Sequence, residues 1–216
     1  MKKGNKNRAG NGGHPNGRPS RDCADKRAKQ RPHPCDNFVF LLRQRVFFIG
    51  FMGAGKTSIA RRCARDCNLV AVDMDSYLER SRECRVRTLF TEYGEEAFRE
   101  LEHEVLLEVS EMDPLFISCG GGIITRPDNR ALLHDEGFVI YLNVSADEAS
   151  RRIRDISSRP LFKDIDAARK INAERKALYA GVADATIDTS GKSVARIANE
   201  ARKLLLRKGV LCQQPK

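Results

Sequence analysis

The chain has 216 residues, of which 41% are hydrophobic, and this suits one globular domain with a real core. Its net charge of +10 is unevenly placed: residues 1–45 carry 12 Lys or Arg against three Asp, whereas residues 46–216 carry 27 basic against 26 acidic residues. The nearly neutral body therefore does not have the charge of a nucleic-acid-binding domain, and the basicity belongs to the N-terminal part.

Residues 1–37 are rich in Gly, Asn, Pro, Lys and Arg and contain almost no large apolar side chains. Such a segment cannot bury enough surface to offset chain entropy, so we predict a disordered basic extension. No aromatic residue interleaves its charges to stack on bases, and we therefore expect at most weak nucleic-acid contact. We expect residues 38–216 to form the folded domain.

The next apolar run, Phe38–Leu42, is too short for a signal peptide or a membrane span, and Arg43 and Arg45 end it. The seven cysteines are odd in number and contain no C-x-x-C pair, which favours neither a disulfide framework nor a zinc site. We therefore expect a cytoplasmic protein with reduced thiols and no membrane partner.

From Val46 onward, short apolar runs alternate with segments of helical periodicity. The expected strands are Val46–Ile49, Leu69–Val72, Leu115–Cys119, Val139–Asn143 and Ala185–Asp188. The expected helices are Lys56–Cys67, Met74–Arg82, Glu95–Glu111, Pro127–Asp135, Ala146–Arg154, Ala167–Ala180 and Ser193–Lys208. This alternation predicts an α/β fold in three layers, with a parallel sheet covered on both faces and ligands beyond the carboxyl ends of its strands.

Between the first strand and the first helix lies Gly50-Phe-Met-Gly-Ala-Gly-Lys-Thr57, which fits the pattern G-x-x-x-x-G-K-[ST] without a mismatch. Glycines in this context allow backbone N–H groups to surround phosphate oxygens at a helix N-terminus. Lys56 can then reach the outer phosphates, and the Thr57 hydroxyl can ligate Mg²⁺. The stretch predicts a nucleoside triphosphate site.

Other polar or flexible residues follow the next two strands. Asp73 and Asp75 come after the second strand, where one carboxylate can serve Mg²⁺ and the other can accept a hydrogen bond from a substrate hydroxyl. Asp75 could equally cap the helix that follows. Gly120-Gly-Gly122 follows the third strand and either permits close approach of a ligand or forms a plain turn.

Six blocks in order extend this picture. Besides the glycine loop and Asp73-x-Asp75 they are Gly94-Glu-x-x-Phe-Arg99-x-x-Glu102, Gly120-Gly-Gly122, Arg159-Pro-Leu161 and Glu174-Arg175-x-x-Leu-Tyr179. Together they resemble the shikimate kinase family over roughly residues 46–206. The resemblance implies a nucleoside-monophosphate-kinase-like P-loop fold with a five-stranded parallel sheet in the order 2-3-1-4-5. It also implies transfer of the ATP γ-phosphoryl group to the 3-hydroxyl of shikimate, in the chorismate pathway to the aromatic amino acids.

The resemblance assigns roles to matching positions. ATP contacts are implied for Gly53, Ala54, Gly55, Lys56, Thr57, Ser58, Arg152 and Arg159. Shikimate contacts are implied for Asp75, Arg99, Gly120, Gly121, Gly122 and Arg175. Mg²⁺ is implied as cofactor, held by Thr57 and Asp73. The catalytic residues are Lys56, Asp75 and Arg159, and Arg159 belongs to a lid at about residues 155–165 that excludes water.

Within this set, the resemblance gives Arg99 and Arg175 the grip on the substrate carboxylate, because guanidinium groups match a planar carboxylate with two hydrogen bonds. Glu102, three residues after Arg99 on the same helical face, orients it. Two positions depart from the family pattern. Glu83 replaces the usual glycine, which bears on closure over the substrate, and Cys119 replaces a small or hydroxyl residue, which suggests sensitivity to thiol reagents.

Two alternatives remain open from the sequence. One is a related small-acid kinase of the gluconate type, and the other is a non-catalytic P-loop regulatory protein. The complete set of catalytic residues favours an enzyme, and we expect it to act as a monomer on shikimate and ATP.

Overall fold

A computed structural model of the protein describes residues 38–153 and 164–215. The predicted disordered extension (residues 1–37) and most of the predicted lid (about 155–165), Arg159 included, lie outside the described residues. The predictions made for those segments therefore stay predictions. Among the helices of the described ranges, none is both long and apolar enough to cross a membrane.

The described residues form a five-stranded parallel sheet. Its strands are β2 (Arg45–Ile49), β3 (Ala71–Asp73), β4 (Phe116–Ser118), β5 (Gly137–Asn143) and β6 (Ala185–Asp188). Their spatial order is β3-β4-β2-β5-β6, with Phe47 of β2 in register with Ile117 and Val139. Counted in chain order, these strands follow the sequence 2-3-1-4-5, which confirms the predicted topology.

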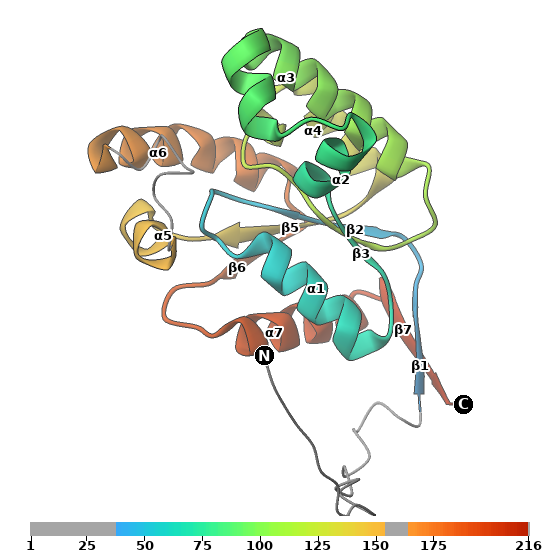
Figure 1. The fold of residues 1–216 in the computed structure, drawn as a ribbon. Helices are drawn as coiled ribbons and strands as arrows, with labels where there is room; N and C mark the ends of the chain where they lie inside the picture. Colours follow the sequence, from blue (N-terminus) through green and yellow to red (C-terminus); the bar gives the residue numbers. More distant parts are fainter. Residues whose placement is uncertain (1–37, 154–163, 216) are drawn as a thin grey trace, which may run out of the picture. The chain divides into compact units, whose positions relative to one another are not determined.

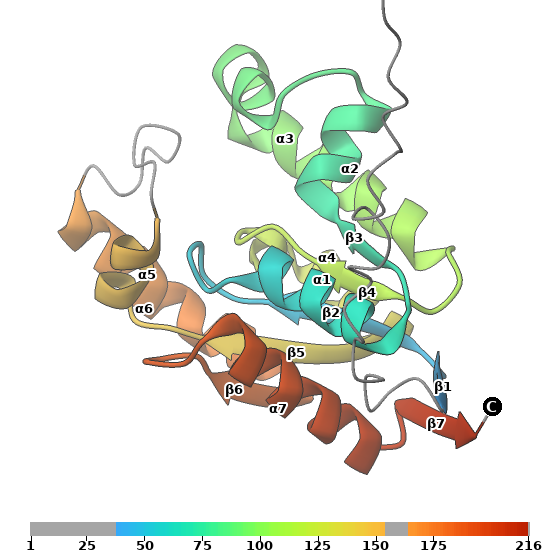
Figure 2. The ribbon, with the colours of Figure 1, turned by 60° about the horizontal axis from the view of Figure 1, so that its bottom comes forward.

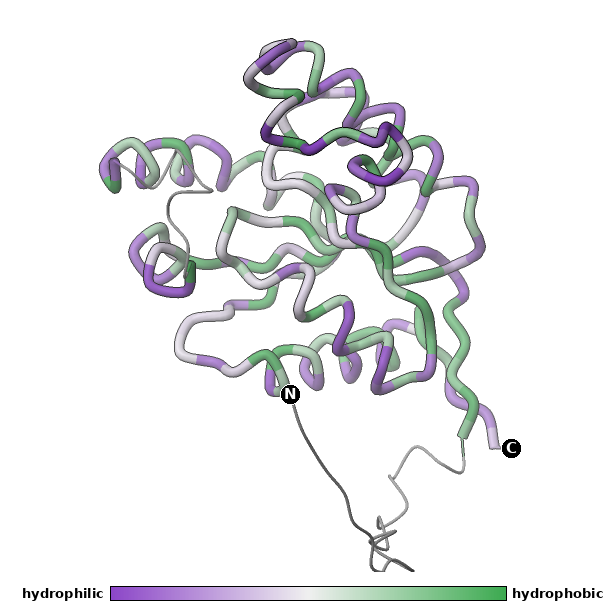
Figure 3. The backbone as a smooth tube through the Cα atoms, viewed as in Figure 1, coloured by the Kyte–Doolittle hydropathy of each residue, from purple (hydrophilic) through white to green (hydrophobic). Residues whose placement is uncertain are grey.

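Both faces of the sheet are buried, and residues alternate between them as the two-residue period of a strand requires. Val46 and Phe48 of β2 contribute to one core, whereas Phe47 and Ile49 contribute to the other. All four are fully buried, so this strand reads as a continuous apolar run, as a central parallel strand should. Figure 3 shows these hydrophobic stretches in the interior and the alternating hydropathy of the outer helices.

Helices cover the sheet on both faces (Figures 1 and 2). The first face packs against α1 (Lys56–Cys67) and α7 (Val194–Arg207), and the second packs against α3 (Val86–Ser110), α4 (Pro127–Glu136) and α6 (Ile165–Val182). The shorter elements are α2 (Met74–Ser81), α5 (Ala146–Arg152) and the 3₁₀ helix η1 (Ile123–Thr125). This is the predicted three-layer α/β/α architecture.

Three local features differ from the sequence-based expectation. The run Phe38–Leu42 forms strand β1, which pairs antiparallel with β7 (Leu211–Pro215) in a separate two-stranded sheet. The helix expected to begin at Glu95 is preceded by a further helical segment from Val86, joined to it at Gly94 with φ 83° and ψ 177°. The cap of α2 is Asp73, whose carboxylate accepts from the Ser76 amide at 3.0 Å, and the expectation that Asp75 caps this helix is wrong.

Candidate active site

The glycine loop lies between β2 and α1, as the motif requires. Gly50 and Gly53 have positive φ values of 141° and 78°, and a Cβ at either position would clash with backbone of the β5–α5 region, at Leu142 and Ala149. Only glycine combines this conformation with this close approach. Ala54 is fully buried and its amide donates to the Phe51 carbonyl at 3.2 Å, whereas Ser58 is exposed in the first turn of α1.

Lys56 is the first residue of α1, and its side chain turns back over the loop. Its Nζ donates to the carbonyl oxygens of Gly50 at 2.8 Å and Phe51 at 3.1 Å. The ammonium group therefore lies beside the first-turn amides of α1, which have no partner within the helix. Positive charge and amide donors together make this end of the helix suited to anionic oxygen.

Thr57 connects the loop to the end of β3. Its hydroxyl donates to Asp73 Oδ2 at 2.7 Å and lies 3.2 Å from the hydroxyl of Ser118 at the end of β4. Burial raises the pKa of Asp73, but hydrogen bonds from Thr57, Ser76 and Ser118 outweigh burial and hold that pKa below its ordinary value. Asp73 is thus kept ionised among hydroxyl groups.

Arg99 projects from α3 onto the glycine run after β4. Its Nη1 donates to Glu102 Oε2 at 2.6 Å, and its Nη2 donates to Glu95 Oε1 at 3.0 Å. A Cβ at Gly122 would come within 3.0 Å of the outer guanidinium atoms, so Arg99 lies directly against this glycine. The ring of Phe98 is 5.2 Å from the guanidinium carbon and supports it from the side.

Glu102 and Asp75 meet at the first glycine of the same run. A Cβ at Gly120 would collide with Glu102 Oε1 and would lie 3.4 Å from Asp75 Oδ1. Glu102 is 3% exposed; burial raises its pKa and the charge of Asp75 adds to this, while Arg99 opposes both. The two carboxyl groups thus approach one another across a residue that offers only backbone.

Arg175 and Tyr179 of α6 contact the middle glycine of this run. Arg175 Nη1 donates to the Gly121 carbonyl at 3.3 Å, and the Tyr179 hydroxyl donates to the same oxygen. A Cβ at Gly121 would lie 3.5 Å from the Met52 amide nitrogen and 3.6 Å from the Gly50 carbonyl oxygen. Gly121 therefore lies close both to the glycine loop and to Arg175 and Tyr179 of α6.

Arg152 ends α5 and is held by the loop that follows β6. Its guanidinium donates to Thr189 Oγ1 at 3.0 Å and to the Thr189 carbonyl at 2.6 Å, and it pairs with Glu148 at 2.6 Å. Glu148 also accepts from the Gly191 amide at 2.9 Å. Arg152, for which an ATP contact is implied, is thus joined to the loop that follows β6.

The structure brings together the predicted residues that fall in the described ranges and adds two that the sequence did not indicate. These are Ser118, beside Thr57, and the hydroxyl of Tyr179, on Gly121. A strand-terminal serine just before a glycine run was a usable signal for Ser118. Nothing in the spacing alone assigned a partner to the Tyr179 hydroxyl.

The two departures from the family pattern also find their place. Cys119 is 2% exposed and burial raises the pKa of its thiol, which argues against the predicted sensitivity of this residue to thiol reagents. Glu83 lies in the turn between α2 and α3 with φ 51°, a left-handed conformation that favours glycine. The substitution therefore places a side chain where the backbone disfavours one.

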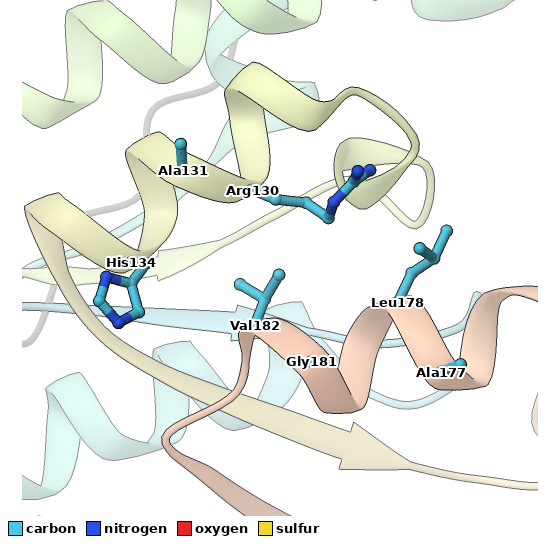
Figure 4. Close-up of a pocket in the computed structure, with 7 residues that line it drawn as sticks. All are labelled: Arg130, Ala131, His134, Ala177, Leu178, Gly181 and Val182. Atoms are coloured by element: carbon cyan, nitrogen blue, oxygen red, sulfur yellow. The ribbon is translucent and has the colours of Figure 1, made fainter.

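A further groove lies away from these residues, between α4 and α6. Figure 4 shows its lining, which is Arg130, Ala131, His134, Ala177, Leu178, Gly181 and Val182. None of the predicted site residues lines it. A second open groove beside α2 includes Ser76, Glu83 and Cys84.

The parallel sheet in this order, the glycine loop and the two arginines beside residues 121–122 define a P-loop protein of the small-molecule kinase class. The family model for shikimate kinase matches residues 52–206. A shikimate kinase from Bacillus mycoides is 39% identical over 160 residues, which cover 73% of this chain and 96% of that protein. The chain belongs to the shikimate kinase family.

Solved structures agree with this assignment. The shikimate kinase from Acinetobacter baumannii, determined in complex with shikimate, superposes with a TM-score of 0.73 at 30% identity, covering 76% of this chain and 94% of that one. A gluconokinase from Sinorhizobium meliloti shares the fold at a TM-score of 0.50 and 14% identity, covering 76% of this chain and 93% of its own. At that identity the likeness concerns the fold alone.

Proposed function

We propose that the protein transfers the γ-phosphoryl group of ATP to the 3-hydroxyl of shikimate, giving ADP and shikimate 3-phosphate for the chorismate pathway. The observation that carries this proposal is the position of Gly121. It adjoins both the glycine loop and Arg175, and Arg99 lies against the next glycine. A triphosphate on the loop and a small acid between the arginines would therefore be neighbours.

In this proposal ATP occupies the glycine loop, with its phosphates on the amides of residues 53–58 and on Lys56. Lys56 exchanges its two carbonyl contacts for the phosphates, which are better partners for an ammonium ion. Arg152 and the loop 189–193 flank the adenine base. Their mutual hydrogen bonds support this assignment because they hold one wall of the base site in place.

Mg²⁺ would be held by Thr57 and Asp73. Their oxygen atoms suit this hard cation. Mg²⁺ usually takes only one or two oxygen ligands from the protein, and phosphates and water supply the others, so one ionised carboxylate beside one hydroxyl would suffice. Among the described residues no group of three or more His, Cys, Asp or Glu could hold a metal, so a site shared with the nucleotide is the arrangement we propose. When bound, the ion supplies charge neutralisation at the phosphates.

Shikimate would lie over residues 120–122 with its carboxylate between Arg99 and Arg175. Asp75 would accept a hydrogen bond from the 3-hydroxyl and orient it for in-line attack on the γ-phosphorus. Because phosphoryl transfer proceeds through a loose transition state, such positioning accounts for much of the rate. Glu102 keeps Arg99 aimed at the carboxylate through the 2.6 Å ion pair.

Arg159 and the lid at about 155–165 complete the proposal. Arg159 would come over the phosphates as the lid closes, stabilising charge that develops in transfer and excluding water. We further propose a cytoplasmic monomer. Cys63, Cys84, Cys119 and Cys212 are free thiols, which supports a reducing compartment.

The test is an ADP-release assay on the purified full chain with ATP and Mg²⁺, comparing shikimate with gluconate. We expect ADP formation that depends on shikimate and gives shikimate 3-phosphate, with no comparable rate on gluconate. Lys56→Ala and Asp75→Asn should each lower turnover by about 10² or more. Arg99→Ala should act mainly through the KM for shikimate. Equal rates on both acids, or none on either, would reject the proposed function.

A further inference from the structure

Besides the contact of Arg99 with Gly122, helix α3 is connected to the glycine run at a second position, one helical turn beyond Arg99. His103 follows Arg99 by four residues and therefore projects from the same face of the helix. Its Nδ1 lies 2.6 Å from Oδ1 of Asn129 on α4. Asn129 is fully buried, and its Nδ2 donates to the carbonyl of Ile123 at 3.1 Å. Ile123 is the residue directly after Gly122.

The direction of these hydrogen bonds is set by chemistry. A carbonyl oxygen only accepts, so the amide nitrogen of Asn129 must face Ile123 and its oxygen must face His103. Nδ1 of His103 therefore carries the proton in this contact, as assigned from the hydrogen-bond network. Each polar atom of the Asn129 side chain has a defined partner, and loss of either partner leaves a buried group unsatisfied.

The result is a closed circuit of contacts. Arg99 lies against Gly122, Gly122 continues into Ile123, and Ile123 is held by Asn129, which is held by His103 of the same helix as Arg99. A circuit of this kind fixes the distance between the guanidinium group and the backbone beside it. The hydrogen bond from Asn129 to Ile123 is buried and the one between His103 and Asn129 is partly buried, so water competes less for them than for exposed hydrogen bonds.

We propose that His103 and Asn129 are positioning residues for the acidic substrate. They hold the backbone at residues 122–123 against α3. Arg99 and the glycine run (residues 120–122) thereby keep the spacing needed to bind the substrate carboxylate. The inference rests on the proposed substrate site, because it concerns the geometry of that site. It predicts an effect on the affinity for shikimate and not on that for ATP, whose contacts lie on the glycine loop and α5.

The same two helices offer a matched control. Glu100 of α3 forms an ion pair with Arg126, the residue that caps α4, at the exposed outer edge of this contact. The Glu100 side chain is 60% exposed, and its pair also joins the two helices but does not touch Ile123. Exposed pairs of this kind contribute little to stability. Removing the Glu100–Arg126 pair loosens the contact between α3 and α4 but leaves the hydrogen bonds of Asn129 in place. It therefore tests whether general loosening alone weakens shikimate binding.

The experiment compares wild-type protein, His103→Leu, His103→Asn and Glu100→Gln by steady-state kinetics and by calorimetric titration with shikimate. His103→Leu removes the donor to Asn129, and we expect KM and Kd for shikimate to rise about fivefold or more. The turnover number and the KM for ATP should stay within about twofold. His103→Asn, whose amide nitrogen is bonded to Cγ as Nδ1 is and can donate in the same direction, should recover most of the affinity, and Glu100→Gln should match wild type.

The inference is overturned if folded His103→Leu binds shikimate as wild type does, or if the KM values for ATP and shikimate rise together. It is also overturned if Glu100→Gln reproduces the loss. If thermal melting shows that His103→Leu does not fold, His103→Ala, which has no donor to Asn129, carries the same test. A wild-type protein that neither binds nor phosphorylates shikimate would instead reject the proposed function, which keeps the two failures apart.

Discussion

Replacing Gly122 with alanine should displace the guanidinium group of Arg99 without changing the arginine itself. Gly122 has an ordinary φ of −101°, so alanine causes no backbone strain there. The added Cβ would, however, come within 3.0 Å of the guanidinium group, whereas ordinary contact begins at 3.4 Å. Because the end of an arginine side chain is flexible, the protein should fold with Arg99 displaced.

The size of the effect follows from what the displaced group does. A hydrogen bond to a charged partner contributes about 1.5–3 kcal/mol, and misplacement by about 1 Å is enough to lose most of it. We therefore expect the KM for shikimate to rise about 10- to 100-fold in Gly122→Ala, with the KM for ATP nearly unchanged. Steady-state kinetics with each substrate varied in turn measures both values.

Gly121→Ala provides the control for folding. A Cβ there would meet its nearest atoms at 3.5 Å or more, so the ligand-free variant should melt close to wild type. Gly122→Ala should likewise retain a cooperative melt. If Gly122→Ala is folded and its KM for shikimate lies within about twofold of wild type, Arg99 does not bind the substrate from the position described here.

Further predictions concern other residues of the protein. Glu83→Gly relieves the left-handed conformation at φ 51° and should stabilise the protein by about 0.5–1 kcal/mol in urea unfolding; a loss of stability would contradict this. Iodoacetamide should leave buried Cys119 unmodified in the native protein while it labels Cys84, as mass spectrometry can check. Burial raises the pKa of Glu102 above 4.5, so its stabilising contribution is complete below that pH and is lost as pH rises through the folded-state pKa. Glu102→Gln should accordingly gain stability relative to wild type from pH 4.5 to 7, and a difference independent of pH would contradict it. Deletion of residues 1–37 should leave the kinetic constants nearly unchanged.

Sequence periodicity was sufficient for the sheet because each core strand is a local signal. Phe47 and its neighbours form an apolar run bounded by turns, and the expected bounds agree with the observed strands within two residues. The β1–β7 pair could not be predicted in the same way. It joins Phe38–Leu42 to Leu211–Pro215, which are far apart in the sequence. Because β7 contains polar Gln213 and Gln214, neither segment predicts that it pairs with the other.

The site shows the same division between local and long-range information. The glycine loop and the order of motifs predicted the residues that we propose to hold phosphate and acid, since chemistry of this kind requires particular side chains at particular spacings. Contacts between segments that are distant in the sequence could not be predicted from the spacing of the motifs. The partner of Asn129 is His103, 26 residues earlier, and the capping role considered for Asp75 belongs to Asp73, the residue directly before the first residue of α2.

The most direct test of the central claim is a crystal structure of the full chain with shikimate, ADP and Mg²⁺. We predict that the shikimate carboxylate lies between the guanidinium groups of Arg99 and Arg175, with its 3-hydroxyl at Asp75 and the phosphates of ADP on the amides around Lys56. A carboxylate bound elsewhere, or a 3-hydroxyl directed away from the nucleotide, would contradict the account.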